Sequence, residues 1–425
     1  MSNYDEKNRV NYLNGKEWIK KAKNYWFYNS LSKEPYIEDM YNFGYKNRVN
    51  GKYELNNPVG QIDSTDFTIS KVFNYNLELI ESIIRRIRIA NYNSYHFVIL
   101  DSDVIMDKNN KNILLSSLFV STLTRYNIDY RGKIILHDID NNVKVALLFL
   151  NRLENDNIKI KDFNICIEPD NFYVNASKTK NIMIFNSYSK MDKFALQHPA
   201  PYSYQDIEKI LDYENINQGR ILDPFLGTGS TILSVGNRDL FTTGIELSKE
   251  YVDISEQRIK KIANFNINYE IINGDSMKVC NHLEKKYDYV ITSPPYHNIL
   301  KNKGMGIRHD ESQKRQGIDY YTESKKDFGN FEYLNEYFDA LSRLFGLIKA
   351  KLTDKARLYI IISDFTVNKI EEDIHSNIIK IMNENGYKYT GTGYIIQNQK
   401  SIYPFGYPYK IVLNHIFQYC MMFEV

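Results

Sequence analysis

The stretch GRILDPFLGTGSTILSVG, residues 219–236, decides the fold of this 425-residue chain. A short apolar run ends at Asp223, glycines follow at positions 227 and 229, and a second apolar run begins after them. A Gly-rich turn of this kind joins a buried strand to a helix and lets a ligand approach the backbone closely. The stretch therefore predicts a strand, a turn and a helix within an α/β protein.

Strands and helices alternate on both sides of this stretch. Helices are predicted at 198–211 and 249–263, and strands at 241–247, 269–276 and 282–296. Such alternation is typical of a parallel, doubly wound sheet of the Rossmann type. We expect one domain over residues 196–425, preceded by an additional α/β region over residues 1–195.

Three acidic residues end successive predicted strands. Glu246 follows Asp223 by 23 residues, close to the spacing at which an acidic residue reaches ribose hydroxyls. Asp275 ends the next strand, where it could accept a hydrogen bond from an adenine amino group. Carboxyl ends of parallel strands meet at one edge of a sheet, so the three residues indicate a nucleoside-binding crevice. The alternative is that they are ordinary polar residues at loop entrances.

The tetrapeptide Ser293-Pro294-Pro295-Tyr296 ends the fourth strand. Two prolines in series fix the backbone and remove two N–H donors, so this loop presents carbonyl oxygens. Together with the Ser293 hydroxyl, such a carbonyl can hold both hydrogens of an exocyclic amine, and Tyr296 offers a face for a stacked base. The alternative is a proline-bounded strand end with a packing tyrosine.

These segments resemble, as a set, the motifs of amino-group DNA methyltransferases that use S-adenosylmethionine. The set consists of HPAPY (198–202), DPFLGTGST (223–231), GIEL (244–247), NGDS (273–276) and VITSPPY (290–296). Three downstream segments resemble members of this family as well: GIDYYTESKKDFGN (317–330), LYIIISDF (358–365) and YPFGYPYK (403–410). The resemblance covers about 198–425 and implies a Rossmann-like methyltransferase domain.

The resemblance implies roles for individual residues. The expected cofactor-binding residues are His198, Asp223, Pro224, Phe225, Gly227, Gly229, Ser230, Thr231, Glu246, Leu247, Asp275 and Ser276. Among them, Glu246 is expected at the ribose and Asp275 at the adenine. Ser293, Pro294, Pro295 and Tyr296 are the expected catalytic residues. Serine at the first position of the tetrapeptide usually accompanies N4-cytosine methylation in this family, whereas Asp or Asn accompanies N6-adenine methylation.

The implied function is methyl transfer to the N4 amine of cytosine in double-stranded DNA, within restriction–modification or phage and host defence. A cognate restriction endonuclease would act as a separate protein. Three alternatives remain: an N6-adenine DNA methyltransferase, an RNA guanine-amine methyltransferase, and a non-catalytic nucleic-acid-binding relative. No metal is expected, because the eight histidines form no HxxxH or HxH pair.

A polar stretch after the tetrapeptide is the candidate DNA contact. Residues 301–326 contain seven Lys and Arg against four Asp and Glu. The expected phosphate or groove contacts are Lys301, Lys303, Arg308, Lys314 and Arg315. The alternative is a solvated face without a partner. The net charge of the whole chain is only +2, so any DNA grip is expected to be local.

Composition narrows the cellular setting. The three cysteines, Cys166, Cys280 and Cys420, form no CxxC pair, which favours a reducing cytoplasm over a disulfide framework or a zinc site. The first residues lack an apolar signal core, and the longest apolar runs fall far short of the ~18–20 residues that cross a bilayer. We therefore expect a cytoplasmic protein without a membrane partner.

The first 195 residues contain an internal echo of the last part of the chain. FVILDSD (97–103) resembles LYIIISD (358–364), and NIDYRG (127–132) resembles GYKYTG (386–391). A third pair joins IMIF (182–185) to CMMF (420–423). Short strand-rich matches also arise by chance, so duplication and coincidence both remain open. A duplicated copy would be a degenerate methylase half or a DNA-recognition part, because no SPPY or DPPY precedes residue 198.

Overall fold

Two compact units make up the chain in the computed structural model. The structure describes residues 8–11, 13–44, 67–72, 75–90, 92–152, 167–177, 183–187, 191–263, 266–297, 300, 321–367 and 370–425. The first unit comprises Met1–Val174, Lys369–Ser376 and Lys400–Phe417. The second unit comprises Asn175–Asn368, Asn377–Gln399 and Gln418–Val425. The expected domain boundary between residues 195 and 196 stays a prediction.

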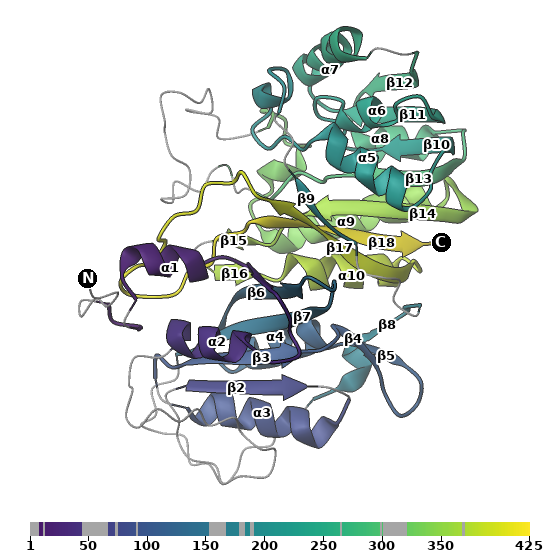
Figure 1. The fold of residues 1–425 in the computed structure, drawn as a ribbon. Coiled ribbons are helices and arrows are strands. Elements are labelled where there is room, and N and C mark those ends of the chain that lie inside the picture. The colour runs from purple at the N-terminus through teal and green to yellow at the C-terminus, as the bar shows by residue number, and fades with distance from the viewer. Residues whose placement is uncertain are drawn as a thin grey trace. The chain divides into compact units, whose positions relative to one another are not determined.

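The second unit is built on an eight-stranded sheet (Figure 1). Its order is β12 (Asn268–Asn273), β11 (Asp239–Glu246), β10 (Gln218–Asp223), β13 (Tyr287–Thr292), β14 (Leu352–Ile362), β18 (Phe417–Glu424), β17 (Lys388–Gln397) and β9 (Ile184–Ser187). The first five strands are parallel, and β18 runs antiparallel to β14. Strand order reverses between β10 and β13, and ligands of doubly wound sheets bind at such a point.

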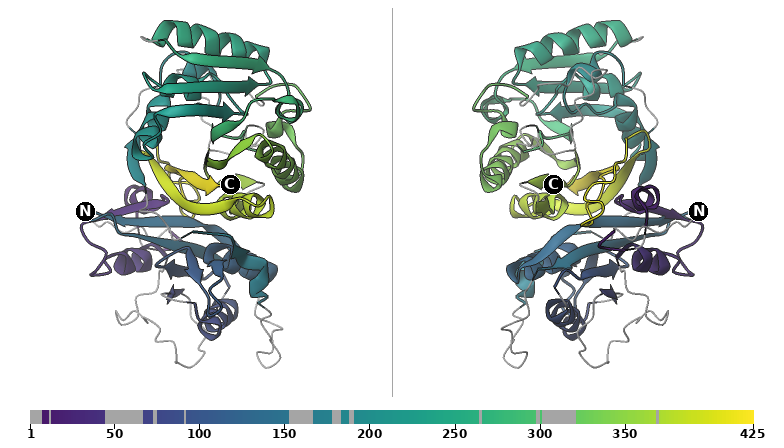
Figure 2. Two further views of the ribbon diagram at one scale, coloured as in Figure 1. Left: turned by 90° about the vertical axis from the view of Figure 1, so that its right-hand side faces the viewer. Right: turned by 90° about the vertical axis from the view of Figure 1, so that its left-hand side faces the viewer.

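Helices cover this sheet on both faces. They are α5 (Tyr204–Tyr213), α6 (Ser230–Ser234), α7 (Lys249–Ile262), α8 (Ser276–His282), α9 (Leu334–Lys349) and α10 (Ile374–Glu384). Helix α5 packs on α6 and α8 packs on α9, and Figure 2 shows the teal α5 and the green α9 on opposite sides of the strands. The predicted doubly wound α/β sheet is therefore confirmed.

The apolar faces of these elements meet in a continuous core. Ile207, Ile210 and Leu211 of α5, at helical spacing, pack against Ile221 of β10 and Ile361 of β14, and all five side chains are at most 1% exposed. Burial of several such side chains at about 1.5–3 kcal/mol each fixes the sheet that carries the strand ends.

The first unit contains a five-stranded sheet of its own. Its order is β1 (Tyr25–Tyr28), β6 (Ile128–Asp138), β7 (Val143–Asn151), β3 (Tyr95–Leu100) and β2 (Phe67–Val72). A small sheet of β4 (Val104–Met106), β5 (Asn112–Leu114) and β8 (Tyr173–Val174) accompanies it. The helices are α1 (Gly15–Lys21), α2 (Tyr36–Gly44), α3 (Leu77–Ile89) and α4 (Leu115–Arg125). The expected additional α/β region is thus confirmed.

Short elements complete the described chain. They are strands β15 (Phe365–Val367) and β16 (Ile370–Glu372) and 3-10 helices at Pro169–Phe172, Ala195–Gln197 and Phe328–Asn330. None of the helices in the described part of the chain has the length and apolar character that crossing a membrane requires.

Candidate functional site

The turn between β10 and α6 depends on two glycines with positive φ. Gly229 has a φ of 82°, and a Cβ there would lie 2.9 Å from the Ser255 Oγ of α7. Gly227 has a φ of 55°, and a Cβ there would meet only the His198 ring, at 3.6 Å from Nε2. Gly229 therefore allows the turn to pack on α7, whereas Gly227 leaves its backbone open toward the cavity described below.

Asp223 lies beneath this turn and is fully buried. Its carboxylate accepts hydrogen bonds from the Phe225 N–H at 3.0 Å and from the hydroxyls of Tyr202, Thr231 and Thr292 at 3.1, 2.5 and 2.7 Å. Burial raises the pKa of Asp223, and these four donors oppose that shift. Because Thr292 is the last residue of β13, Asp223 joins the carboxyl ends of the two strands on either side of the strand-order reversal.

Glu246 ends β11 and faces the same turn. One carboxylate oxygen accepts from the Gly227 N–H at 2.8 Å, and the other accepts from the Ser248 N–H at 2.8 Å. Burial raises the pKa of Glu246 to about 7. Each carboxylate oxygen can accept a further hydrogen bond, so Glu246 retains acceptor capacity toward a ligand's hydroxyl groups.

Asp275 and Ser276 begin α8 at the end of the third strand. The Asp275 carboxylate accepts from the Met277 N–H at 3.0 Å, which caps the helix. Its other oxygen lies 4.0 Å from the Lys326 Nζ. The Ser276 hydroxyl donates to the Pro224 carbonyl at 2.5 Å, so it ties α8 to the glycine turn.

The tetrapeptide loop follows β13. The Tyr296 hydroxyl accepts a hydrogen bond from the Gln418 side-chain amide at 3.1 Å, and its ring contacts Phe365 edge to face at 5.8 Å. Burial raises the pKa of Tyr296, so the phenol stays protonated at physiological pH.

These loops surround one cavity of about 800 Å³, part of which is open to solvent. Eight of the predicted cofactor residues line it: His198, Pro224, Phe225, Gly227, Glu246, Leu247, Asp275 and Ser276. All four residues of the tetrapeptide, Ser293, Pro294, Pro295 and Tyr296, line it too. The other four predicted residues, Asp223, Gly229, Ser230 and Thr231, lie behind this lining, where they support the turn. Its lining combines apolar rings with carboxylate acceptors, which suits a nucleoside.

Residues 321–328 form a further wall of the cavity. None of the predicted site residues belongs to this wall. The Tyr321 ring stacks on His198 at 5.4 Å, and the Phe328 ring contacts Phe225 at 5.2 Å. Asp327 holds the wall by accepting from the Thr322 and Gly329 N–H groups, both at 2.8 Å. The only signal for this wall in the sequence is the resemblance of GIDYYTESKKDFGN (317–330) to family members.

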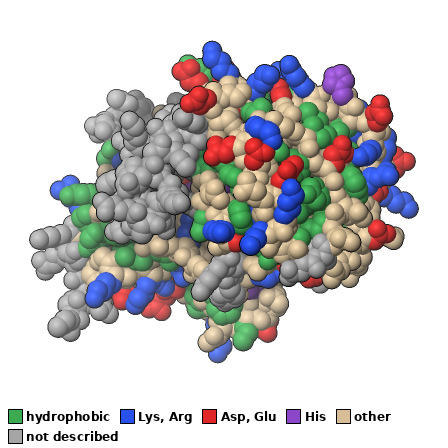
Figure 3. Space-filling view, turned by 90° about the horizontal axis from the view of Figure 1, so that it is seen from above, with side chains coloured by type: hydrophobic (Ala, Val, Ile, Leu, Met, Phe, Trp, Pro, Cys, Tyr) green, Lys and Arg blue, Asp and Glu red, His purple; other side chains and the backbone are tan. Residues whose placement is uncertain are grey.

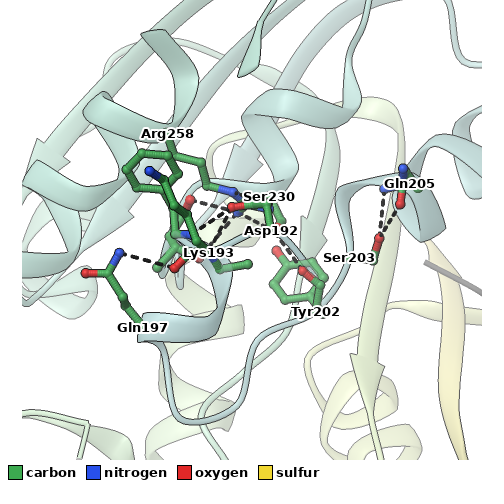
Figure 4. A network of polar contacts seen from close by, with 11 residues as sticks. Asp192, Lys193, Gln197, Tyr202, Ser203, Gln205, Ser230 and Arg258 are labelled. Atoms are coloured by element: carbon green, nitrogen blue, oxygen red, sulfur yellow. Dashed lines mark hydrogen bonds and ion pairs between the residues drawn. The ribbon is translucent and has the colours of Figure 1, made fainter. Parts of the chain in front are cut away.

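Arg258 of α7 holds the turn from the opposite side. Its side chain is 1% exposed and donates to the Thr228 carbonyl and the Ser230 Oγ, both at 2.9 Å. It also pairs with Asp192 at 2.8 Å, and Ser230 in turn donates to the Tyr202 carbonyl at 2.7 Å (Figure 4). Sequence reasoning missed this network, because its partners are 28–66 residues apart and no spacing relates them.

The predicted DNA contacts cannot be placed in this geometry. Lys301, Lys303, Arg308, Lys314 and Arg315 lie outside the described residues. On the face seen in Figure 3, Lys and Arg side chains are interspersed with Asp and Glu side chains over the described surface. A basic groove on that face therefore gains no support from the described residues.

Comparison with known proteins identifies the family. The sequence profile of the N6/N4 DNA methylases matches residues 2–257, more than half of the chain. The chain belongs to the N6/N4 DNA methylase family. The resemblance stated from the motifs is thereby confirmed. The match ends within α7, so the tetrapeptide of this methylase lies outside it.

Individual relatives match shorter stretches of the methylase. The Type II methyltransferase M.ScaI of Streptomyces caespitosus is 36% identical over 63 residues, 15% of this chain and 21% of the relative. The orphan methyltransferase M.BamHII of Bacillus amyloliquefaciens is 40% identical over 74 residues, 17% of this chain and 27% of the relative. The chain thus spans about a quarter of the length of these relatives.

A solved structure resembles part of the methylase. Magnesium protoporphyrin IX methyltransferase from Synechocystis, solved with bound S-adenosylmethionine, is 13% identical and has a TM-score of 0.31. The alignment covers 52% of this chain and 77% of that chain.

The family's cofactor is S-adenosylmethionine, and the residues around the cavity fit it. Glu246 offers acceptors for ribose hydroxyls, Gly227 leaves room at the backbone, and Phe225 and Phe328 supply apolar walls. The chain therefore has, where its strand order reverses, a cavity whose hydrogen-bond acceptors suit a nucleoside cofactor.

Proposed function

We propose that this methylase transfers a methyl group from S-adenosylmethionine to the exocyclic N4 amine of cytosine in double-stranded DNA. The observation that carries the proposal is the position of Ser293-Pro294-Pro295-Tyr296, which lines the same cavity as Glu246 and Asp275. One cavity thus contains acceptors for an exocyclic amine and acceptors for a nucleoside cofactor.

The cofactor would be held along the carboxyl ends of β10, β11 and β12. Glu246 would accept hydrogen bonds from the ribose, Asp275 would bind the adenine amine, and Gly227 would border the methionine part. When bound, S-adenosylmethionine supplies the methyl group as a sulfonium. Asp223 would hold the glycine turn in place without contacting the cofactor, because four internal donors already bind its carboxylate.

The target base would be rotated out of the duplex, at a cost of a few kcal/mol. The Ser293 hydroxyl and the Pro294 carbonyl would accept the two amine hydrogens, which orients the nitrogen lone pair. Tyr296 would stack on the base as a neutral phenol, because its raised pKa excludes a phenolate at physiological pH. Such positioning of two reactants can contribute about 7–11 kcal/mol to lowering the barrier.

The base preference rests on the serine at the start of the tetrapeptide. The Type II methyltransferase among the relatives supports a setting in restriction–modification, where any cognate endonuclease would be a separate protein.

The test is the modified base itself. DNA from a host without endogenous base methylation is digested to nucleosides and analysed by mass spectrometry after expression of the full chain. We expect N4-methylcytosine, and we expect Ser293→Ala to lower it by at least about 100-fold, because an oriented hydrogen-bond partner is lost. Ser121→Ala, on α4 and outside the cavity, is the matched control and should leave the level unchanged.

Other outcomes separate the alternatives. Accumulation of N6-methyladenine instead would show that the proposed base is wrong. Methylated guanine in RNA, with unmodified DNA, would identify an RNA methyltransferase. Cofactor binding without any methylated product would indicate a non-catalytic relative.

A further inference from the structure

The five-stranded sheet of the first unit and one half of the second unit's sheet have the same strand order. In the first unit the order is β2, β3, β7, β6 and β1, and in the second unit it is β13, β14, β18, β17 and β9. Strand directions agree as well: β2 is parallel to β3 as β13 is to β14. Strand β3 is antiparallel to β7 as β14 is to β18, and β6 is parallel to β1 as β17 is to β9.

The elements also follow one another in the same order along the chain. With the short strands β4 and β5, and β15 and β16, set aside, the first series runs β2, α3, β3, α4, β6, β7, and the second runs β13, α9, β14, α10, β17, β18. In each case the remaining edge strand, β1 or β9, comes earlier in the chain. We call the strands β13, β14, β18, β17 and β9 with the tetrapeptide loop the base-side half of the catalytic sheet.

Residue-level features agree at the end of a helix and in the strand that follows it. Asn127 and Gly386 both precede the corresponding strands with a left-handed φ, 57° and 75°. Five residues later in each copy a glycine also has positive φ, 124° at Gly132 and 145° at Gly391. A shared sheet topology could arise from packing preferences, and a left-handed residue commonly follows a helix, but a second glycine with positive φ at equal spacing within the strand indicates common descent.

An aromatic contact joins the corresponding strands in each copy. The rings of Tyr130 and Phe149, on β6 and β7, lie 5.8 Å apart at 53°. The rings of Tyr389 and Phe423, on β17 and β18, lie 5.7 Å apart at 58°. The echo of NIDYRG in GYKYTG is therefore a correspondence in three dimensions. The third sequence pair does not correspond in the sheet, because CMMF lies on β18, which occupies the place of β7, whereas IMIF leads into β9.

The same alignment locates the counterpart of the tetrapeptide. Matching FVILDSD to LYIIISD places Leu100 at Ile361. Val72 pairs with Leu100, and Thr292 pairs with Ile360, so Val72 corresponds to the next residue, Ser293. The counterpart of Ser293-Pro-Pro-Tyr296 is then the sequence VFNY at 72–75, which keeps the tyrosine and lacks the serine and both prolines.

Among the described residues, the first copy shows no counterpart of the cofactor side either. In the second unit, α5 to α8 and strands β10 to β12 stand between β9 and β13, and they carry the turn, Glu246 and Asp275. Between β1 and β2, the described residues form only α2. No Gly-x-Gly sequence occurs anywhere within residues 1–195.

We infer that the first unit is a second, silent copy of the base-side half, which binds no cofactor and transfers no methyl group. The chain thus has one cofactor site and one transfer centre. The family match is consistent with a base-side copy that precedes the cofactor-side elements. It covers residues 2–257, which comprise the silent copy followed by the glycine turn and Glu246. The inference rests on the proposed function, because it assigns methyl transfer to the second unit alone.

Calorimetric titration of the full chain with S-adenosylhomocysteine tests the cofactor part. One equivalent per chain is expected, and two equivalents would overturn the inference. Absence of binding would instead contradict the proposed function, so the two failures are distinguishable.

A matched pair of tyrosine variants tests the transfer part. Tyr296→Ala should lower kcat by at least about 100-fold, because the base loses its stacking partner and its orientation. Tyr75→Ala, at the corresponding position of the silent copy, should keep kcat within about threefold of the parent. If Tyr75→Ala lost as much kcat while one equivalent of S-adenosylhomocysteine still bound, the first copy would be a working part of the reaction centre and the inference would be wrong.

Discussion

The buried carboxyl group of Glu246 makes cofactor binding depend on pH. Burial raises the pKa of Glu246 to about 7. Ribose hydroxyls donate hydrogen bonds best to the ionised carboxylate. Binding therefore favours deprotonation, and the affinity for S-adenosylhomocysteine should weaken below about pH 7 by up to about tenfold per pH unit. Titration calorimetry from about pH 5.5 to about pH 8 measures this slope.

Glu246→Gln is the control for this prediction, because a glutamine does not titrate. The variant should bind more weakly at neutral pH and show a flat profile, and an equally steep profile in the variant would assign the slope to another group. The raised pKa has a second consequence for the free protein. The unfolded carboxyl ionises near 4.5, so the free energy of unfolding should fall as pH rises from 4.5 towards 7.

At the scale of elements, Arg258 makes helix α7 a support for the glycine turn. Its guanidinium is 1% exposed and pairs with Asp192, which is 25% exposed. Removing one partner of such a buried pair costs up to about 3–5 kcal/mol, less here because Asp192 reaches solvent. Arg258→Ala should therefore lower the free energy of unfolding in urea and weaken S-adenosylhomocysteine binding.

The matched control lies on the same helix. Lys249 pairs with Asp253 on the exposed face of α7, where solvent screens such pairs and they contribute little to stability. Lys249→Ala should leave the cofactor affinity unchanged. Equal losses in the two variants would show that α7 responds to any lost ion pair, and that Arg258 has no special role at the turn.

The wall at 321–328 gives a prediction of a different kind. Asp327 accepts two backbone N–H groups, and Asn330 donates to the Thr322 and Ser324 carbonyls at 2.7 and 2.9 Å. These bonds stay within residues 322–330, so Asp327→Ala should loosen the wall with little change in the unfolding midpoint. We expect an affinity loss of about tenfold for S-adenosylhomocysteine, about 1.4 kcal/mol. Glu332→Ala, exposed and just outside the wall, is the control, and an equal affinity loss there would contradict the assigned role.

Local signals in the sequence predicted individual elements well. The helix predicted within 198–211 begins at Tyr204 after the Ser203 cap, and the strand ending at Asp223 and its turn occur as expected. These features depend on neighbours in the chain, such as a capping side chain or an apolar run before a glycine turn. The Arg258 network and the wall depend on contacts between distant segments, which no periodicity encodes.

At the scale of the whole molecule, local sequence patterns could not predict how the chain divides into two units. Residues 369–376 and 400–417 belong to the first unit although they follow the tetrapeptide in the sequence. Segment 400–417 supplies Ile411 and Leu413 to a core that also contains Trp18 and Phe97. Assigning that segment requires the side-chain packing, because its own sequence predicts neither a helix nor a strand.

This late segment also affects how the protein is made. The Asn24 side-chain oxygen accepts from the Ile416 N–H at 2.8 Å, and the Ile411 N–H donates to the Tyr95 hydroxyl at 2.8 Å. Independent N-terminal domains can fold while the ribosome is still translating the rest of the chain. Here, the first unit cannot complete its core until residues 400–417, which follow the tetrapeptide in the sequence, have left the ribosome.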